Sequence, residues 1–135
     1  MRITRDTIDK IIAHAEQDAP IEACGFLFGK EGKITRHRPV TNVERRTDHF
    51  TFEPNEQLAS YQYAARDELE IIGVYHSHPV TPAVPSEEDM RLARKQNLLH
   101  VLVSLVEGEK RVRGFYIKDG RAEEEPLVVH DDREA

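Results

Sequence analysis

The hydrophobic positions in the first half of the chain predict two amphipathic helices. Residues 3–18 place apolar side chains at a spacing of three to four, and Thr4 or Asp6 is expected to cap this helix. Residues 54–69 repeat the spacing, with Pro54 at a position that suits the first turn of a helix. The inward faces that we expect are Ile8, Ile11, Ile12 and Ala15 in the first helix and Leu58, Tyr61, Ala65 and Leu69 in the second.

Short apolar runs rich in β-branched and aromatic residues predict strands. Residues 71–76 form such a run and are typical of a central strand covered on both faces. A third helix is expected at residues 86–97, after a proline-rich loop. Turns are expected at 30–33 and 107–109. The other expected strands are residues 22–29, 33–40, 49–52, 98–106, 111–118 and, as an edge strand, 127–130.

This order of elements predicts a mixed α/β fold with one layered domain over residues 1–135, in which residues 122–135 form a peripheral tail. A chain of 135 residues has the length of one ordinary domain, and 39% hydrophobic residues suffice for a core. The apolar run at 101–106 is far too short to span a bilayer. The N-terminus is polar and lacks the apolar segment of a signal peptide.

Charge and cysteine content restrict the function classes and the compartment. The formal net charge is −6 at pH 7 and no basic cluster occurs, which argues against a nucleic-acid-binding protein. Cys24 is the only cysteine, so no intrachain disulfide can form. That suits the reducing cytoplasm. We therefore expect a cytoplasmic protein that binds neither nucleic acid nor a membrane.

The segment YHSHPVTPAVPSEEDM, residues 75–90, carries the candidate chemistry. Residues two apart on a strand point to the same face, so His76 and His78 are expected to project together. Neutral imidazoles and a carboxylate are good zinc ligands, and Asp89 follows His78 by eleven residues. Three protein ligands leave a fourth zinc position open, which is the pattern of a catalytic site.

Simpler interpretations compete with the metal site. A single His-x-His on a strand is often incidental, and residues 86–89 also fit a capping box, the S-x-x-[DE] pattern at the start of a helix. Cys24 could act as a nucleophile beside a histidine, but a cysteine inside an apolar strand is usually inert core. The joint spacing of the two histidines, Ser86 and Asp89 favours the metal site.

The stretch from His76-Ser77-His78-Pro79 through Ser86 to Asp89 resembles the His-x-His-x7-Ser-x2-Asp signature of the JAMM (MPN+) metalloproteases. Glu22, in IEACGFLFG at 21–29, takes the place of that family's upstream glutamate. The resemblance extends from the first helix to about Tyr116. It implies a curved mixed β-sheet flanked by helices, related to the cytidine-deaminase fold.

The resemblance also implies a role for each signature residue. His76, His78 and Asp89 would bind one zinc ion per chain. Glu22 would be the general base for the water that zinc activates, and Ser86 would help to hold the oxyanion. The implied reaction is hydrolysis of an amide or isopeptide bond after the C-terminal Gly-Gly of a ubiquitin-like or sulfur-carrier protein, as in compact prokaryotic members of the family.

Two other functions stay open from the sequence. A non-catalytic binding or scaffold module is the first, as in metal-free members of the family, although those have lost ligands that this chain keeps. A deaminase is the second, because the folds are related. Zinc deaminases use His-x-Glu with Pro-Cys-x-x-Cys, which a chain with one cysteine cannot supply. The attached amine and the oligomeric state are left open.

Overall fold

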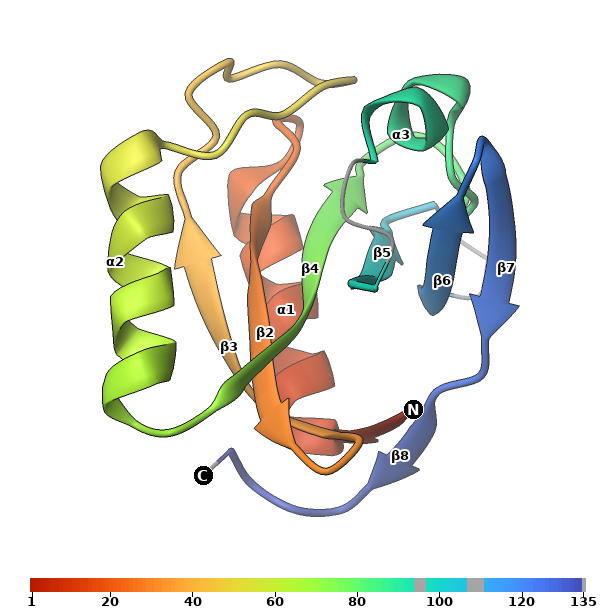
Figure 1. Cartoon of the computed structure of the whole chain (residues 1–135). Coiled ribbons are helices and arrows are strands. Elements are labelled where there is room, and N and C mark those ends of the chain that lie inside the picture. Colours follow the sequence, from red (N-terminus) through yellow and green to blue (C-terminus); the bar gives the residue numbers. More distant parts are fainter. Residues whose placement is uncertain (94–96, 107–110, 135) are drawn as a thin grey trace.

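The computed structural model describes residues 1–93, 97–106 and 111–134 of the chain. Within these ranges, eight strands form one mixed sheet in the order β7-β6-β5-β4-β2-β3-β1-β8, and the sheet is twisted and curved (Figure 1). The strands are β1 (Arg2–Thr4), β2 (Cys24–Lys30), β3 (Lys33–Val40), β4 (Glu70–His78), β5 (Leu99–Ser104), β6 (Val112–Lys118), β7 (Arg121–Glu125) and β8 (Val128–His130). The helices are α1 (Arg5–Asp18), α2 (Pro54–Arg66) and α3 (Glu87–Leu92).

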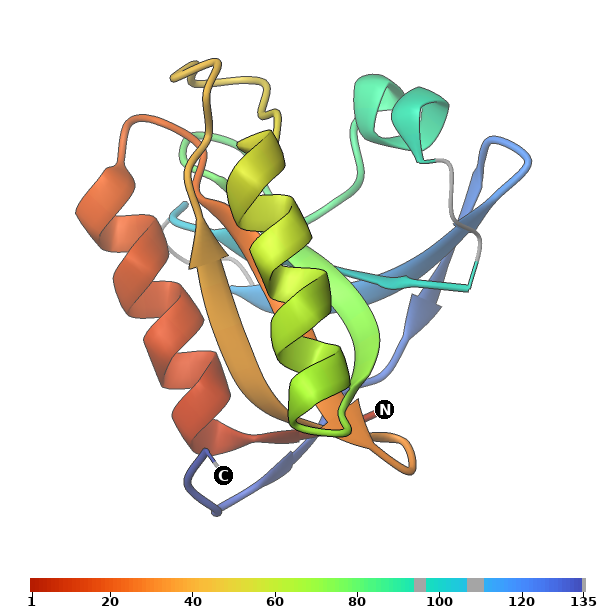
Figure 2. The same ribbon diagram turned by 60° about the vertical axis from the view of Figure 1, so that its left-hand side comes forward.

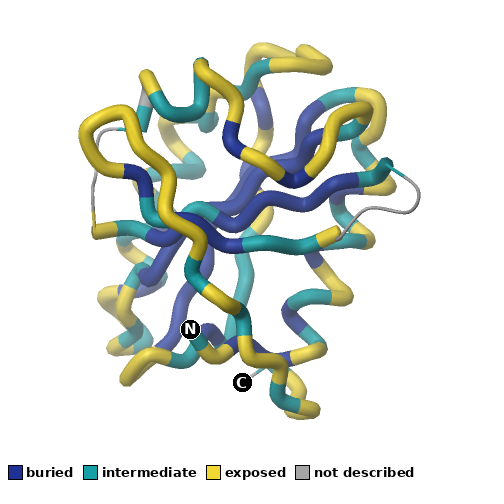
Figure 3. The backbone as a smooth tube through the Cα atoms, turned by 90° about the vertical axis from the view of Figure 1, so that its right-hand side faces the viewer, coloured by how far each residue is buried: buried dark blue, intermediate teal, exposed yellow. Residues whose placement is uncertain are grey.

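The two long helices cover opposite faces of the sheet, as Figure 2 shows for α1 and α2. Alternate residues of β4 supply both cores, since successive side chains on a strand point to opposite faces. Tyr75 packs in the core beneath α1, whereas Val74 packs with Phe26 in the core beneath α2. The central strands are therefore buried along most of their length, and exposed residues gather at the loops (Figure 3). The expected mixed sheet flanked by helices is confirmed.

The first helix starts where a polar residue can satisfy its free N–H groups. The hydroxyl oxygen of Thr4 accepts a hydrogen bond from the N–H of Thr7 at 3.1 Å, so Thr4 and not Asp6 is the cap. Ile11 and Ala15 are fully buried, which confirms the expected inward face. No strand was expected before this helix, but residues Arg2–Thr4 are extended. They form β1, which pairs in parallel with β3 and with β8.

The inward face expected around α2 is confirmed for Tyr61 and Leu69, which pack against the core, and is wrong for Leu58 and Ala65. Leu58 is 54% exposed and Ala65 is also exposed, whereas Ser60 and Ala64 are buried. The helix packs on the sheet through its aromatic residues, because Tyr61 lies against Phe26 with ring centroids 5.7 Å apart. Leu58 is consequently an apolar side chain on the outer surface of the protein.

Two other boundaries differ from expectation near the end of β4. Residues 49–52 form no strand and make only the isolated bridge Asn42↔Phe52. The helix expected at 86–97 is α3, which ends at Leu92 because Ala93 leaves the helical conformation, with φ −69° and ψ 111°. The expected turn at 107–109 lies outside the described residues.

The C-terminal segment contributes to both edges of the sheet. The acidic residues 123–125 lie in β7, largely exposed, and pair with β6. The edge strand expected at 127–130 is confirmed as β8. Beyond it, the carboxylate of Glu134 accepts hydrogen bonds from the His37 N–H and imidazole at 2.7 Å each and from the Thr7 hydroxyl at 3.1 Å. The last described residues are thus fixed to α1 and β3.

Candidate metal centre

The C-terminal end of β4 carries two histidine side chains on the face that α2 covers. His76 is 2% exposed and His78 is 4% exposed, and their ring centroids are 5.1 Å apart. The proline-containing loop after β4 returns the chain to α3, whose first turn brings Asp89 to the same place. Figure 1 shows α3 and the loop 41–53 at this end of the sheet.

The three side chains that the sequence assigned to a metal meet in the structure. The Asp89 carboxylate lies between the histidines, with Oδ1 at 3.2 Å from His76 Nε2 and Oδ2 at 3.1 Å from His78 Nε2. Each of the three residues offers one potential ligand atom, and these three atoms lie within 4.8 Å of one another. These atoms belong to one small, largely buried cluster.

The chemistry of the cluster fits a zinc ion. Both ring nitrogens of His76 are buried without a hydrogen-bond partner, since the contact with Asp89 lacks hydrogen-bond geometry. Such a group costs free energy unless a metal or another partner satisfies it. His78 Nδ1 lies 2.8 Å from the carbonyl oxygen of Pro82. A donated N–H there leaves Nε2 as the ligand atom, which is the usual support of a metal-binding histidine.

Electrostatic interactions within the cluster favour the charged forms of Asp89 and His78. Although burial opposes ionisation of Asp89, the nearby imidazoles of His76 and His78 and the hydrogen bond from the Ser86 N–H hold the pKa of its carboxyl well below its usual range. Burial alone would lower the pKa of His78, but the hydrogen bonds with Asp89 and Pro82 raise it. The carboxylate is therefore ready to bind a cation without first losing a proton.

Glu22 lies beside this cluster because of a hydrogen-bonded junction between β4 and the residues before β2. The hydroxyl of Ser77, the residue between the two histidines, accepts a hydrogen bond from the Ala23 N–H at 2.8 Å. The Ser77 N–H donates to the carbonyl oxygen of Ala23 at 2.9 Å. Glu22 itself is only 5% exposed. Burial, together with the charge of Asp89, raises the pKa of Glu22 to about 8, against the attraction of His78.

The buried carboxyl of Glu22 should make the metal-free protein less stable as pH rises. Its pKa increases from 4.5 to about 8 on folding, so the unfolded chain loses the proton first and stability falls between these values. Glu22→Gln should reduce that loss, by roughly 2 kcal/mol between pH 5 and pH 9. Urea unfolding of the chelator-treated variants would measure it. Glu87→Gln, at an exposed position, is the control, and identical pH dependence in both variants would contradict the expectation.

Ser86 occupies the N-cap of α3 and completes a capping box with Asp89. Its hydroxyl oxygen accepts a hydrogen bond from the Asp89 N–H at 3.0 Å, and its own N–H donates to Asp89 Oδ2 at 2.9 Å. The structural interpretation of residues 86–89 is therefore correct, and the same bonds orient the Asp89 carboxylate toward the histidines. The capping box therefore also places Asp89 beside the two histidines.

Several residues that shape the site carried no signal in the sequence. Asn42 is buried and its side-chain amide donates to the carbonyl oxygens of Glu22 and His49, both at 3.0 Å. Its side-chain oxygen accepts from the N–H of Thr51 at 3.1 Å. Phe50 stacks on the His76 ring with centroids 4.6 Å apart. These contacts depend on how the loop 41–53 folds over β4, which neither periodicity nor motif spacing reveals.

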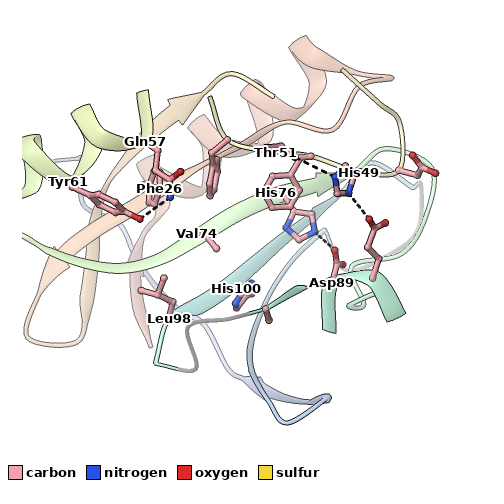
Figure 4. Close-up of a pocket in the computed structure, with 15 residues that line it drawn as sticks. Phe26, His49, Thr51, Gln57, Tyr61, Val74, His76, Asp89, Leu98 and His100 are labelled. Carbon is pink, nitrogen blue, oxygen red and sulfur yellow. Dashed lines mark hydrogen bonds and ion pairs between the residues drawn. The ribbon is translucent and has the colours of Figure 1, made fainter. Parts of the chain in front are cut away.

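A cavity of about 590 Å³ adjoins the metal centre and extends toward α2 (Figure 4). Its walls are mainly apolar and aromatic, with Phe26, Phe52 and Val74 among them, and His76 and Asp89 line one end. His49 Nδ1 lies 2.6 Å from the Glu88 carboxylate, and this contact links the loop to α3 beside His76 and Asp89. His100 lines the floor, and burial lowers its pKa to about 4, so it is neutral.

Cys24 does not have the properties of a nucleophile. Its side chain is fully buried, and burial raises the pKa of its thiol to about 12. The thiol donates to the carbonyl oxygen of Val40 at 3.4 Å.

Among the residues that the structure describes, His76, His78 and Asp89 form the only group of three or more His, Cys, Asp or Glu side chains that could hold a metal ion. In the same residues, no helix has the length and apolar character needed to cross a membrane.

Solved structures resemble the chain over almost its whole length. A protein from Desulfitobacterium hafniense aligns with a TM-score of 0.89 and 35% identity, covering 98% of this chain and 94% of that one. A JAB1/MPN domain protein from Archaeoglobus fulgidus aligns with a TM-score of 0.67 and 22% identity, covering 96% and 98%. The second likeness concerns the fold alone, and it confirms the JAB/MPN architecture that the signature implied.

Sequence comparisons identify the family. The chain is 38% identical over 131 residues to the CysO-cysteine peptidase of Mycobacterium tuberculosis, covering 94% of this chain and 89% of that protein. The model of prokaryotic homologs of the JAB domain matches residues 4–116, which contain all five signature positions. The chain therefore belongs to the prokaryotic JAB family, the JAMM group of peptidases.

Proposed function

We propose that this protein is a zinc-dependent peptidase that hydrolyses the amide or isopeptide bond after the C-terminal Gly-Gly of a ubiquitin-like or sulfur-carrier protein. The buried ligand set with Glu22 beside it supports the chemistry most strongly. The peptidase from M. tuberculosis, named for CysO-cysteine, supports the substrate class. A free buried thiol suits the cytoplasm, where we place the reaction.

In the proposed mechanism, His76, His78 and Asp89 would hold one zinc ion, which would supply Lewis-acid activation of water and of the scissile carbonyl. Glu22 accepts the proton of the attacking water and delivers it to the leaving amine. Its pKa of about 8 without a cation favours the protonated carboxyl. A positive charge at the ligands stabilises the carboxylate and lowers that pKa, so that Glu22 can exchange a proton near neutral pH.

Ser86 can donate a hydrogen bond while it caps α3. A hydroxyl has one donor and two acceptor sites, and the cap uses an acceptor site for the Asp89 N–H. The O–H therefore remains available for an oxyanion beside the ligands, where such a donor contributes to transition-state stabilisation. The side chain is exposed, so a substrate can reach it.

The loop over β4 offers a backbone edge for an extended tail. Val43 donates to the Thr51 carbonyl and Glu53 to the Thr41 carbonyl, both at 3.0 Å, on either side of the bridge between Asn42 and Phe52. In this pattern the N–H and C=O of Phe52 point away from Asn42, where an added strand can pair with them. Glycines suit a tail that passes close to a metal centre, since they bring no side chains.

A non-catalytic binding or scaffold function is the alternative. Metal-free scaffolds need not keep the ligands, the base or the hydroxyl donor together. All five residues are present in this chain, and the three ligands meet in one cluster. This retention favours the enzyme.

The substrate proposal is tested by matched substrates. A carrier–amino-acid adduct, a carrier–lysine isopeptide, diubiquitin and the isolated tail peptide should be offered to the zinc-loaded protein, with mass spectrometry to locate the cut. We expect cleavage after the final glycine, faster for folded carrier adducts than for the peptide, because a flexible tail alone makes few contacts and has a large ordering cost. Equal cleavage of the free peptide would indicate a general zinc peptidase instead.

A further inference from the structure

Three arginines surround one tyrosine on the flank of α2 that faces β3. The guanidinium carbons of Arg36, Arg38 and Arg66 lie 5.9, 5.2 and 5.4 Å from the centre of the Tyr63 ring. Arg36 also donates to the Tyr63 hydroxyl and to Asp67, at 2.8 Å each. These four residues, Arg36, Arg38, Tyr63 and Arg66, are called the arginine cluster below.

The charge of the cluster is poorly compensated by its surroundings. Asp67 forms ion pairs with Arg36 at 2.8 Å and with Arg66 at 3.1 Å. Arg38 forms no ion pair with any residue in the described ranges. Three positive charges against one contacting carboxylate leave a local charge of +2 on a chain whose net charge is −6. Like charges gathered on one surface repel one another, and an anionic partner relieves that repulsion.

The cluster is arranged in advance for contact with a partner. Stacking of guanidinium groups on an aromatic ring limits their motion, so little rotamer entropy remains to be lost on binding. Arginine and tyrosine are also enriched at the centres of protein–protein interfaces. Arg66 is 72% exposed, and Leu58 adds an exposed apolar side chain on the same helix.

The cluster lies within reach of the cavity beside the metal centre. Arg38 pairs in register with Phe26, and Phe26 pairs with Val74, so one row of the sheet connects the cluster with two cavity residues. Neighbouring strands lie about 4.8 Å apart, so Arg38 on β3 and Val74 on β4 are separated by about 10 Å across β2. In α2, Tyr61 lines the cavity while Tyr63 belongs to the cluster. Because α2 packs above this row, with Tyr61 on Phe26, a tail that starts at the cluster has to pass around the helix and needs more than the three or four extended residues, at about 3.3 Å each, that the straight line would take.

We propose that the arginine cluster and Leu58 form the docking surface for an acidic face of the folded carrier protein. The body of the carrier sits over α2, and its C-terminal tail crosses the flank of the helix into the cavity and reaches the metal centre. This inference rests on the proposed function and adds a second contact region, which explains why a folded carrier binds better than its tail alone.

The test separates docking of the body from binding of the tail. The carrier whose adduct the enzyme cleaves is shortened by its last four residues, and its binding to the zinc-loaded protein is measured by isothermal titration calorimetry. Wild-type protein should bind it, more weakly as salt rises. Arg38→Glu/Arg66→Glu should bind at least 10-fold more weakly, and Arg66→Glu alone about 3-fold. The matched control is Lys118→Glu/Arg121→Glu, two exposed positions paired between β6 and β7, which should bind like wild type.

Kinetics with the complete adduct distinguish the possible failures. KM should rise about 10-fold in Arg38→Glu/Arg66→Glu with kcat and thermal unfolding unchanged. If wild-type protein cleaves no carrier adduct, the proposed function fails and the docking surface with it. If both double variants share the wild-type KM and affinity, only the docking surface is wrong. Binding of a short RNA in place of the shortened carrier, lost in Arg38→Glu/Arg66→Glu, would also overturn the proposal.

Discussion

Replacing His78 by alanine is expected to abolish most zinc binding and, with it, hydrolysis. In the proposed site His78 would supply one of three ligand atoms, and its Nδ1 contact with Pro82 fixes the orientation of the ring. Loss of a residue that merely orients a ligand weakens metal binding about 10–100-fold, so loss of the ligand itself should exceed about 100-fold. Elemental analysis after dialysis against a fixed free zinc concentration would measure the occupancy.

His100→Ala is the matched control for this experiment. His100 is a neutral imidazole that lines the same cavity, but it does not belong to the ligand cluster. Its variant should keep about as much zinc as the wild type. Equal zinc contents in the His78 and His100 variants would remove His78 from the ligand set.

Replacing Glu22 by glutamine is expected to leave zinc binding intact and to lower kcat by about 10²–10⁴-fold, the usual contribution of a general acid–base group. Glutamine has nearly the same shape but cannot accept a proton. The structure places Glu22 outside the cluster of ligand atoms, so the zinc content should not change. Single-turnover kinetics on zinc-quantified samples would separate the chemical step from product release.

Asn42→Ala gives a useful comparison with the Glu22 variant. Asn42 fixes the Glu22 carbonyl and the loop but carries no group for proton transfer at the site. Its loss should reduce activity less than Glu22→Gln does and should leave the pH profile of kcat in place. A Glu22→Gln enzyme that turns over normally would exclude Glu22 as the base, and one without zinc would identify Glu22 as a ligand.

The ligand set could be predicted because its geometry is local in the sequence. His76 and His78 lie two apart on a strand, so any fold that forms this strand points them together. A short loop leads from β4 to the start of α3, which the capping residues Ser86 and Asp89 mark in the sequence, and this brings Asp89 back to the histidines. The position of Glu22 came from resemblance, since its approach to the histidines depends on pairing between β2 and β4.

The features that the sequence did not reveal depend on contacts between distant segments. Arg2–Thr4 forms a strand only because β3 and β8 lie on either side of it. The outward orientation of Leu58 follows from the aromatic residues of β2, which select the opposite side of α2 for packing. The acidic residues 123–125 are held in β7 by pairing with β6 and by an ion pair between Arg113 and Glu124 at 2.8 Å.

The zinc dependence of carrier cleavage is the most direct measurement of the central claim. The protein is freed of metal with a chelator and dialysed. Zinc is then added in steps while mass spectrometry follows cleavage of a carrier–amino-acid adduct. We predict no cleavage without zinc, and cleavage after the final glycine that rises in proportion to zinc until one ion per chain is bound. Cleavage that is unchanged by chelation, or its absence at one zinc per chain, would contradict the account.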